Sequence, residues 1–192
     1  MNYDFYAFLS RMKHIKRWSL MRSVIEENIM EHSFMVTTVA HALALIRKEI
    51  FKKEVDLYKT LTYAQYHETG EVITGDLPTP IKYFNQNITQ AYKDLEVISC
   101  QKLIKMLPDE LQQTYTEMIF PDKDSIEAKI VKQADRICAL IKCIEEIRAG
   151  NSEFKKAKQS ILKDINKFDS EECKYFIENI LPSFDKTLDE LQ

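Results

Sequence analysis

The stretch Ser125–Ala149, "SIEAKIVKQADRICALIKCIEEIRA", decides the fold class, because it predicts one long helix. Ser125 is a typical helix N-cap residue, and "GN" at 150–151 is a typical helix end. Cys138 belongs to the expected apolar stripe of this helix. Asp135 lies on or beside that stripe, where an unpaired charge is costly. We therefore expect Asp135 to be paired with an arginine or capped by backbone donors, or else to bind a metal.

Helical patterns recur along the rest of the sequence, and strand alternation does not. The expected helices cover 5–15, 31–50, 57–70, 87–107, a helix opened by Pro108, 152–165 and 170–188. The segment "TGDLPTP" at 74–80 is expected to be non-helical, because each proline favours extended geometry in the residue before it. The sequence therefore predicts an all-α fold, with a single helical domain spanning residues 1–192.

Composition narrows the class of protein. The chain has 192 residues, of which 45% are hydrophobic and only 3 are glycine, which suits one helical globular domain. The net charge is −3 without a basic run, so a nucleic-acid polymer is not expected as a partner. No signal peptide or membrane span is expected. The four cysteines form no C-x-x-C pair, and we expect reduced core residues of a cytoplasmic protein.

The four histidines, His14, His32, His41 and His67, are the residues best suited to metal chemistry. His67 lies in "HETGE", which resembles a metalloprotease helix only at first sight. A zincin needs H-E-x-x-H, so that two imidazoles one turn apart hold zinc, and here Glu71 occupies the fifth position. The protease interpretation is therefore rejected. Taken alone, His32 is more often a hydrogen-bonded core residue than a ligand.

A better fit is one histidine from each of two helices, an adjacent acid and an aspartate from a third helix. That set is His32, His67, Glu68 and Asp135. Mixed imidazole and carboxylate ligands suit a divalent transition metal such as Mn, Co, Fe or Zn. Four protein ligands on an octahedral ion leave positions for water and for a phosphate oxygen, as phosphoester hydrolysis requires.

These motifs together resemble the HD-domain phosphohydrolase superfamily, and most closely the bacterial 5′-deoxynucleotidases. The resemblance runs through nearly the whole chain. It is carried by "RWSLMR", "ENIMEHS", "YHETGEVITGDLPTPIKYFN", "KQADRICALIKCIEE", "AGNSEF" and "PSFDKTLDE". It implies an HD-type bundle in which His32, His67, Glu68 and Asp135 hold a divalent cation such as cobalt or manganese. It further implies that a metal-activated water removes the 5′-phosphate from deoxyribonucleoside 5′-monophosphates.

The resemblance also implies roles for other residues. Arg17 would orient the phosphate, Trp18 would pack on the sugar, and Glu71 would be the catalytic carboxylate. The substrate-contacting residues would be Arg17, Trp18, His32, Glu68, Asp76, Leu77, Pro78, Thr79 and Asp135. A planar, always charged guanidinium suits a phosphate, and an indole face suits a sugar or base. The alternatives without a functional role are that Trp18 is a core residue, that Arg17 is a surface charge, and that the prolines form an ordinary connector. A homodimer and a cytoplasmic location are implied as well.

One position departs from the family, which has aspartate where this chain has Glu68. The charge is unchanged, but the extra methylene moves the carboxylate by about one C–C bond. We expect metal binding to persist, with an altered metal preference or lower turnover. The alternatives are a catalytically weak or silent nucleotide-binding sensor on the same fold, and an HD-type hydrolase of another nucleotide phosphoester.

Overall fold

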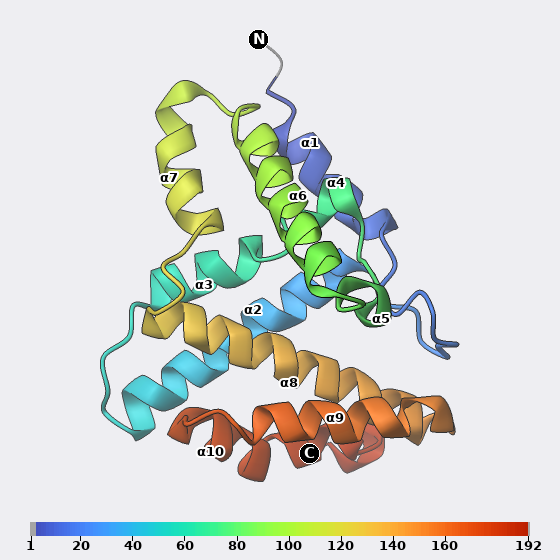
Figure 1. Cartoon of the computed structure of the whole chain (residues 1–192). Coiled ribbons are helices and arrows are strands. Elements are labelled where there is room, and N and C mark those ends of the chain that lie inside the picture. The colour runs from blue at the N-terminus through green and yellow to red at the C-terminus, as the bar shows by residue number, and fades with distance from the viewer. Residues whose placement is uncertain (1–2, 192) are drawn as a thin grey trace.

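The chain folds into helices throughout, as the sequence predicts (Figure 1). The computed structural model describes residues 3–191. Its α-helices are α1 (Phe5–Leu9), α2 (Ile29–Leu45), α3 (Leu57–Tyr66), α4 (Glu71–Thr74), α5 (Thr79–Lys82), α6 (Gln86–Ile104), α7 (Asp109–Ile119), α8 (Ile126–Arg148), α9 (Lys155–Ile165) and α10 (Glu171–Asn179). Within the described residues the only extended pairing is one isolated bridge between Lys16 and Asn28. The all-α prediction is confirmed.

Two long helices, α2 and α8, form the centre of the molecule and cross each other (Figure 1). Their facing side chains include Val36, Leu43, Ile137 and Leu140, which are fully buried. α3 packs against both helices, and α9 covers α8 on the opposite side. α6 and α7 stand apart with α1, where Phe5, Leu103 and Leu107 form a second small core. The four cysteines are free and buried, as expected.

The starts of both central helices are set by capping side chains. Asn28 accepts hydrogen bonds from the Met30 and Glu31 amides, and the Glu31 side chain accepts one from the Asn28 amide. This capping box starts α2 at Ile29, two residues before the expected start. Ser125 accepts a hydrogen bond from the Ala128 amide and caps α8, as predicted. Both helices then bring a polar residue, His32 or Asp135, into the interior.

The region 57–82 differs from the prediction in two ways. The expected helix over 57–70 ends at Tyr66, and a turn over 67–70 separates it from the short helix α4. Gly75, with φ of 74°, ends α4 in a conformation that glycine tolerates best. The expectation that 74–80 is entirely non-helical was wrong at both ends. Thr74 closes α4, and Pro80 lies in the first turn of α5, where its fixed φ favours a helix start.

The other boundaries shift for local reasons. The first expected helix is divided into α1 and a 3-10 helix, η1 (Ser10–His14), and the end of the 31–50 helix becomes a π-helix, η2 (Ile46–Ile50). A 3-10 turn, η3 (Ser152–Phe154), precedes α9. The last expected helix ends early, at Asn179, because Pro182 has no backbone N–H with which to continue the α-helical hydrogen bonds. Two 3-10 helices follow, η4 (Leu181–Asp185) and η5 (Leu188–Glu190).

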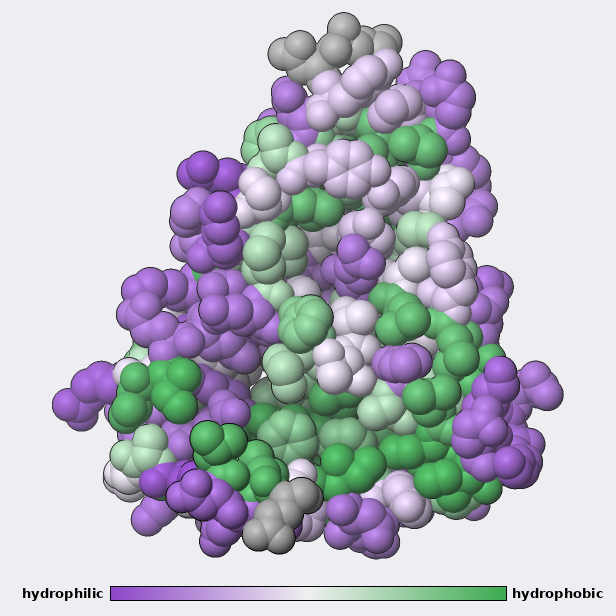
Figure 2. Space-filling view, turned by 180° about the vertical axis from the view of Figure 1, so that it is seen from behind, coloured by the Kyte–Doolittle hydropathy of each residue, from purple (hydrophilic) through white to green (hydrophobic). Residues whose placement is uncertain are grey.

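The surface is less uniformly polar than the composition suggests. Figure 2 shows hydrophobic residues gathered over the lower half of the face behind that of Figure 1. The segment Ile29–Ile50 is long and apolar enough to cross a membrane by composition alone. Half of its apolar window is buried inside the protein, however, because α2 is a central core helix. Its hydrophobicity is therefore explained by packing.

The central helix crossing predicts a large cost for truncating one of its leucines. Leu140→Ala should lower the free energy of unfolding by about 2–5 kcal/mol, because it leaves a cavity between buried helices. Leu95→Ala on α6 is the matched control, since this leucine is also within a helix but is exposed, and should change stability by about 0.5 kcal/mol. Urea unfolding followed by circular dichroism measures both. Equal losses would contradict the assigned core.

Candidate active site

Four residues that are far apart in the sequence meet where α2, α3 and α8 converge. His32 comes from the first turns of α2, His67 and Glu68 from the turn after α3, and Asp135 from the middle of α8. Each offers one ligand atom, and these atoms all lie within 4.8 Å of one another. The structure thus assembles the set that the sequence singled out. We refer to these four residues as the ion cluster.

The distances within the ion cluster suit a shared cation. His32 Nε2 lies 3.1 Å from Asp135 Oδ1 and 3.7 Å from Glu68 Oε1. His67 Nε2 lies 3.5 Å from the same Glu68 oxygen. The His67 Nδ1 atom donates to the Ala64 carbonyl at 2.7 Å, which leaves Nε2 with its lone pair. That Nε2 atom is buried without a hydrogen-bond partner among residues 3–191, so the donor set fits a divalent ion.

The electrostatics favour the cation-binding forms of His67, Asp135 and Glu68. Burial lowers the pKa of His67, so its imidazole is neutral at pH 7. Burial alone would raise the pKa of Asp135, but the hydrogen bond with His32 and the nearby charges of His32, His67 and Arg17 together outweigh it and hold the pKa well below its usual range. Burial likewise opposes ionisation of Glu68, and His67, His32 and Arg17 together lower its pKa. The cluster therefore presents two carboxylates.

Arg17 and Trp18 border the ion cluster and share one carboxylate. Arg17 Nη1 lies 3.4 Å from Glu68 Oε1, while its Nε donates to Glu27 Oε2 at 3.1 Å. The indole Nε1 of Trp18 donates to that same Glu27 oxygen at 3.0 Å. Trp18 has a φ of 59°, which is unusual for a bulky residue, and its ring lies 5.3 Å from that of Phe154. Strained backbone of this kind is often kept at functional sites.

Glu27 was not predicted. Its neighbours in "ENIMEHS" show the helix cap and His32, but nothing in that spacing shows that a carboxylate at 27 returns to residues 17 and 18. Glu27 Oε1 also lies 3.9 Å from His32 Nδ1. One side chain therefore faces the guanidinium, the indole and an imidazole of the ion cluster.

Glu71 is a buried carboxyl at the start of α4. Its amide donates to the Glu68 carbonyl at 3.0 Å, which places it beside the ion cluster. Only 5% of Glu71 is exposed, and its Oε2 has no hydrogen-bond partner in the part of the chain that the structure describes. Burial, with the charges of Glu68 and Asp76, raises the pKa of Glu71 to about 9. This carboxyl is therefore poised to exchange a proton.

The predicted substrate loop, residues 76–79, comes shortly after α4 in the chain. Burial raises the pKa of Asp76, and the nearby charge of Arg17 partly opposes that rise. Leu77 and Pro78 are half-buried, whereas Thr79 is exposed at the start of α5. The structure therefore brings Asp76 beside Arg17 and leaves Thr79 facing solvent.

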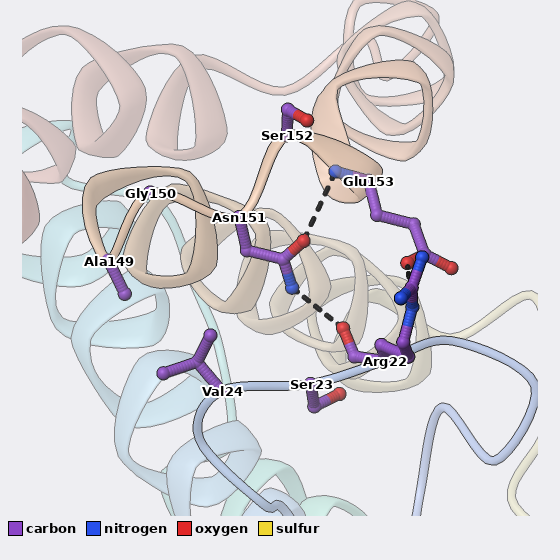
Figure 3. Close-up of a pocket in the computed structure, with 8 residues that line it drawn as sticks. All are labelled: Arg22, Ser23, Val24, Ala149, Gly150, Asn151, Ser152 and Glu153. Atoms are coloured by element: carbon purple, nitrogen blue, oxygen red, sulfur yellow. Dashed lines mark hydrogen bonds and ion pairs between the residues drawn. The ribbon is translucent and has the colours of Figure 1, made fainter.

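Two cavities lie near this region. A pocket of about 130 Å³ borders His67 and is lined by Tyr63, His67, Met118, Ile119, Pro121, Ala128 and Val131. A larger, open cavity of about 530 Å³ contains none of the ion cluster. It lies where the loop at 22–24 meets the turn at 149–153 (Figure 3). The larger cavity is therefore not the site of the ion cluster, and the smaller one borders it through His67.

Comparison with known proteins identifies relatives over almost the whole chain. The family of YfbR-like 5′-deoxynucleotidases matches residues 4–184. A 5′-deoxynucleotidase of Vibrio cholerae is 47% identical over 188 residues, covering 97% of either chain. An HD-domain phosphohydrolase of Listeria innocua has a similar structure, with a TM-score of 0.84, 26% identity and coverage of 94% and 88% of the two chains.

A more distant structure shares the fold alone. The cyanophage S-2L HD phosphohydrolase, solved with dA and one catalytic Zn²⁺ ion, is 17% identical with a TM-score of 0.66. It covers 93% of this chain and 96% of its own.

The ion cluster predicts which substitutions remove the metal. His32→Ala and Asp135→Ala should each lower the metal-to-protein ratio measured by elemental analysis, because each deletes one of four converging ligands. His41→Ala is the matched control, since this exposed histidine also lies on α2 but outside the cluster. Unchanged metal content in both cluster variants would refute the ligand assignment.

Proposed function

The chain belongs to the family of YfbR-like 5′-deoxynucleotidases, and from this premise we propose how its residues carry out the reaction. It is an HD-type metal-dependent hydrolase that removes the 5′-phosphate from deoxyribonucleoside 5′-monophosphates. The predictions of an enzyme and of this activity are thereby confirmed. The observation that carries the mechanism is the ion cluster beside Arg17, on a chain 47% identical to a named 5′-deoxynucleotidase.

We infer that His32, His67, Glu68 and Asp135 hold the divalent cation. When bound, the ion supplies Lewis-acid chemistry, in which it neutralises phosphate charge and acidifies water. The buried His67 Nε2 without a partner supports this assignment. Glu68 supports it too. Its side chain is one methylene longer than the aspartate that the resemblance implies at this position, yet its carboxylate oxygen still lies close to both imidazoles.

Arg17 is proposed to orient and neutralise the phosphate. Glu27 fixes the guanidinium through Nε, and Glu68 lies near Nη1. The charge of a guanidinium is permanent, and its parallel N–H groups match two phosphate oxygens. A phosphate beside Glu68 would therefore meet a cationic group that the protein has already positioned. This preorganisation favours catalysis, because little reorganisation remains to be done during reaction.

Trp18 and the loop 76–79 are proposed to receive the nucleoside. The Trp18 indole is held at one edge by Glu27 and rests on Phe154, so its plane is fixed before substrate arrives. A fixed indole offers a flat apolar face to a deoxyribose. Pro78 restricts the loop, which lowers the entropy lost when Asp76, Leu77 and Thr79 become ordered on substrate.

Glu71 is proposed to handle the proton that hydrolysis releases. Its carboxyl is buried next to Glu68, and one oxygen has no partner in the described structure. Because its pKa is raised to about 9, the Glu71 carboxyl carries a proton at neutral pH, so it can give that proton to the leaving oxygen and take one from the attacking water. Burial keeps bulk water from competing for that proton.

Two further assignments complete the proposal. We infer a homodimer, which the resemblance implies and the apolar area of Figure 2 supports. We also infer a cytoplasmic location, which the free, buried cysteines support.

Substrate assays test the proposed reaction. The protein loaded with Mn²⁺ or Co²⁺ should release phosphate from dAMP, dGMP and dTMP, and more slowly from the corresponding ribonucleotides. EDTA should stop the release, and adding the ion back should restore it. The side chains of the site are not Lewis acids themselves, so the reaction depends on the bound ion. Metal-loaded protein that releases no phosphate from any of these compounds would refute the proposed activity.

Glu71→Gln tests the proton-handling residue. The amide keeps the size of the side chain but cannot accept a proton, so kcat should fall about 10²–10⁴-fold. Metal content should be unchanged, and thermal stability should not fall, because burial already keeps the Glu71 carboxyl uncharged at neutral pH and the amide is uncharged too. A variant with intact metal and parental kcat would remove Glu71 from the mechanism.

A further inference from the structure

The segment that carries Arg17 and Trp18 leaves the core and returns ten residues later. It is closed at its base, where the Arg17 amide donates to the Glu27 carbonyl at 2.9 Å and Lys16 bridges Asn28. We call residues 17–27 the phosphate loop. Its outer side chains contribute little burial, because Leu20 is 63% exposed and Val24 is 62% exposed. Trp18 and Met21 pack against the core near its start, but the exposed remainder of the phosphate loop needs another interaction to hold it in place.

A buried carboxylate on α8 provides that interaction. Glu146 is completely buried, and its two oxygens accept hydrogen bonds from the amides of Val24 at 2.9 Å and Ile25 at 3.0 Å. The Lys142 Nζ lies 2.6 Å from Glu146 Oε1 and also donates to the Ile25 carbonyl. One ion pair of α8 therefore satisfies both donors and an acceptor at the tip of the phosphate loop.

Asn151 completes the attachment from the turn after α8. Its Nδ2 donates to the Arg22 carbonyl at 2.7 Å and to Glu146 Oε2 at 2.8 Å. Its Oδ1 accepts a hydrogen bond from the Glu153 amide at 3.2 Å, as Figure 3 shows. We call Lys142, Glu146 and Asn151 the loop clamp. The close-up shows that this turn and the phosphate loop face each other across the open cavity.

The loop clamp is ionic at neutral pH. Burial of Glu146 opposes its ionisation, but the hydrogen bonds from Lys142, Val24 and Ile25 outweigh it and lower the pKa to about 2. A buried pair of this kind holds its geometry firmly, since breaking it leaves the remaining charge without a partner.

The same turn also supports the Trp18 ring. Asn151 caps the 3-10 turn η3, which ends in the fully buried Phe154. The ring of Phe154 lies 5.3 Å from that of Trp18, and Lys142 Nζ lies 5.9 Å from the Phe154 centroid. The loop clamp therefore fixes the phosphate loop and, through Phe154, the surface on which its tryptophan rests.

We propose that Lys142, Glu146 and Asn151 are positioning residues that hold Arg17 and Trp18 in their reactive orientation beside the ion cluster. This inference rests on the proposed function. None of the three belongs to the ion cluster, so the loop clamp governs how substrate is oriented and not whether the cation binds. Small displacements of orienting groups are costly, because a shift of about 1 Å can change the rate a hundredfold.

Glu146→Gln and Asn151→Ala test the loop clamp by kinetics. Each should raise KM for dAMP and lower kcat/KM by about tenfold to a hundredfold while the metal content stays that of the parent. Glu172→Gln is the matched control. Glu172 is another buried carboxylate, paired with Arg47 at 3.3 Å on η2, at the far end of the α2 segment from His32. It should lower the melting temperature without changing KM.

Trp18 provides a readout that needs no activity, because it is the only tryptophan in the sequence. At a temperature where circular dichroism shows each variant folded, Glu146→Gln and Asn151→Ala should shift its emission to the red. They should also increase its quenching by acrylamide. Glu172→Gln should do neither. If Glu146→Gln does not fold, Asn151→Ala tests the loop clamp by itself, because the Asn151→Ala substitution leaves no buried charge unpaired.

Two results would overturn the proposal. One is a folded Asn151→Ala variant with parental KM and parental Trp18 emission. The other is a Glu172→Gln variant that reproduces the kinetic and fluorescence changes, which would show a general loss of stability. If the parent hydrolyses none of the deoxynucleotides, the proposed function fails, while the Trp18 measurements still decide whether the loop clamp positions the phosphate loop.

Discussion

The structure depends on a partly buried polar contact where its two core helices cross, in which the His32 side chain is fully buried and that of Asp135 is 31% exposed. His32 Nε2 and Asp135 Oδ1 lie 3.1 Å apart, between helices whose other facing residues are aliphatic. Such groups are costly to bury unless they are paired, so α2 and α8 must cross at a fixed point and in a fixed register. The turn after α3 then adds His67 and Glu68 to the same point. The requirement for pairing inside the core thus also creates the geometry that a divalent ion needs.

The charges around this point explain how acidic residues are placed together. Glu68, Asp135, Glu71 and Glu27 gather within one region, and Arg17 forms ion pairs with two of them, Glu27 and Glu68. Carboxylates this close repel one another unless positive charge is added. A divalent ion held by the proposed ligands would offset one part of this negative charge and Arg17 offsets another, while the raised pKa of Glu71, about 9, keeps that carboxyl uncharged at neutral pH. A phosphate entering the loaded site would then meet positive charge that is already in place.

Much of this arrangement follows from the sequence, and the remainder does not, for physical reasons. Helix periodicity and the Ser125 cap define α8 and place Asp135 beside its apolar stripe. The family resemblance adds the pairing with His32, His67 and Glu68, which local spacing cannot show because the contact joins three helices. Glu27, Glu146 and Asn151 were missed, because their partners are mainly backbone amides, carbonyls and side chains of a loop that lacks periodicity. The turn at 67–70 was missed because propensity alone does not show that His67 and Glu68 must turn away from α3 to meet His32.

The residues proposed to bind the ion and those proposed to orient the phosphate are built on different kinds of structure. The ion cluster stands on α2, α8 and the turn after α3, whose positions are set by the hydrophobic core. Arg17 and Trp18 stand on a loop with exposed outer side chains, which a buried ion pair and one asparagine attach to the same helix α8. A core cannot hold a loop that must stay at the surface to admit substrate, so polar groups of α8 hold it instead. α8 thereby carries the proposed ligand Asp135 and, three turns further along, Glu146, which anchors the phosphate loop. One rigid helix would therefore set the distance between the ion and the arginine.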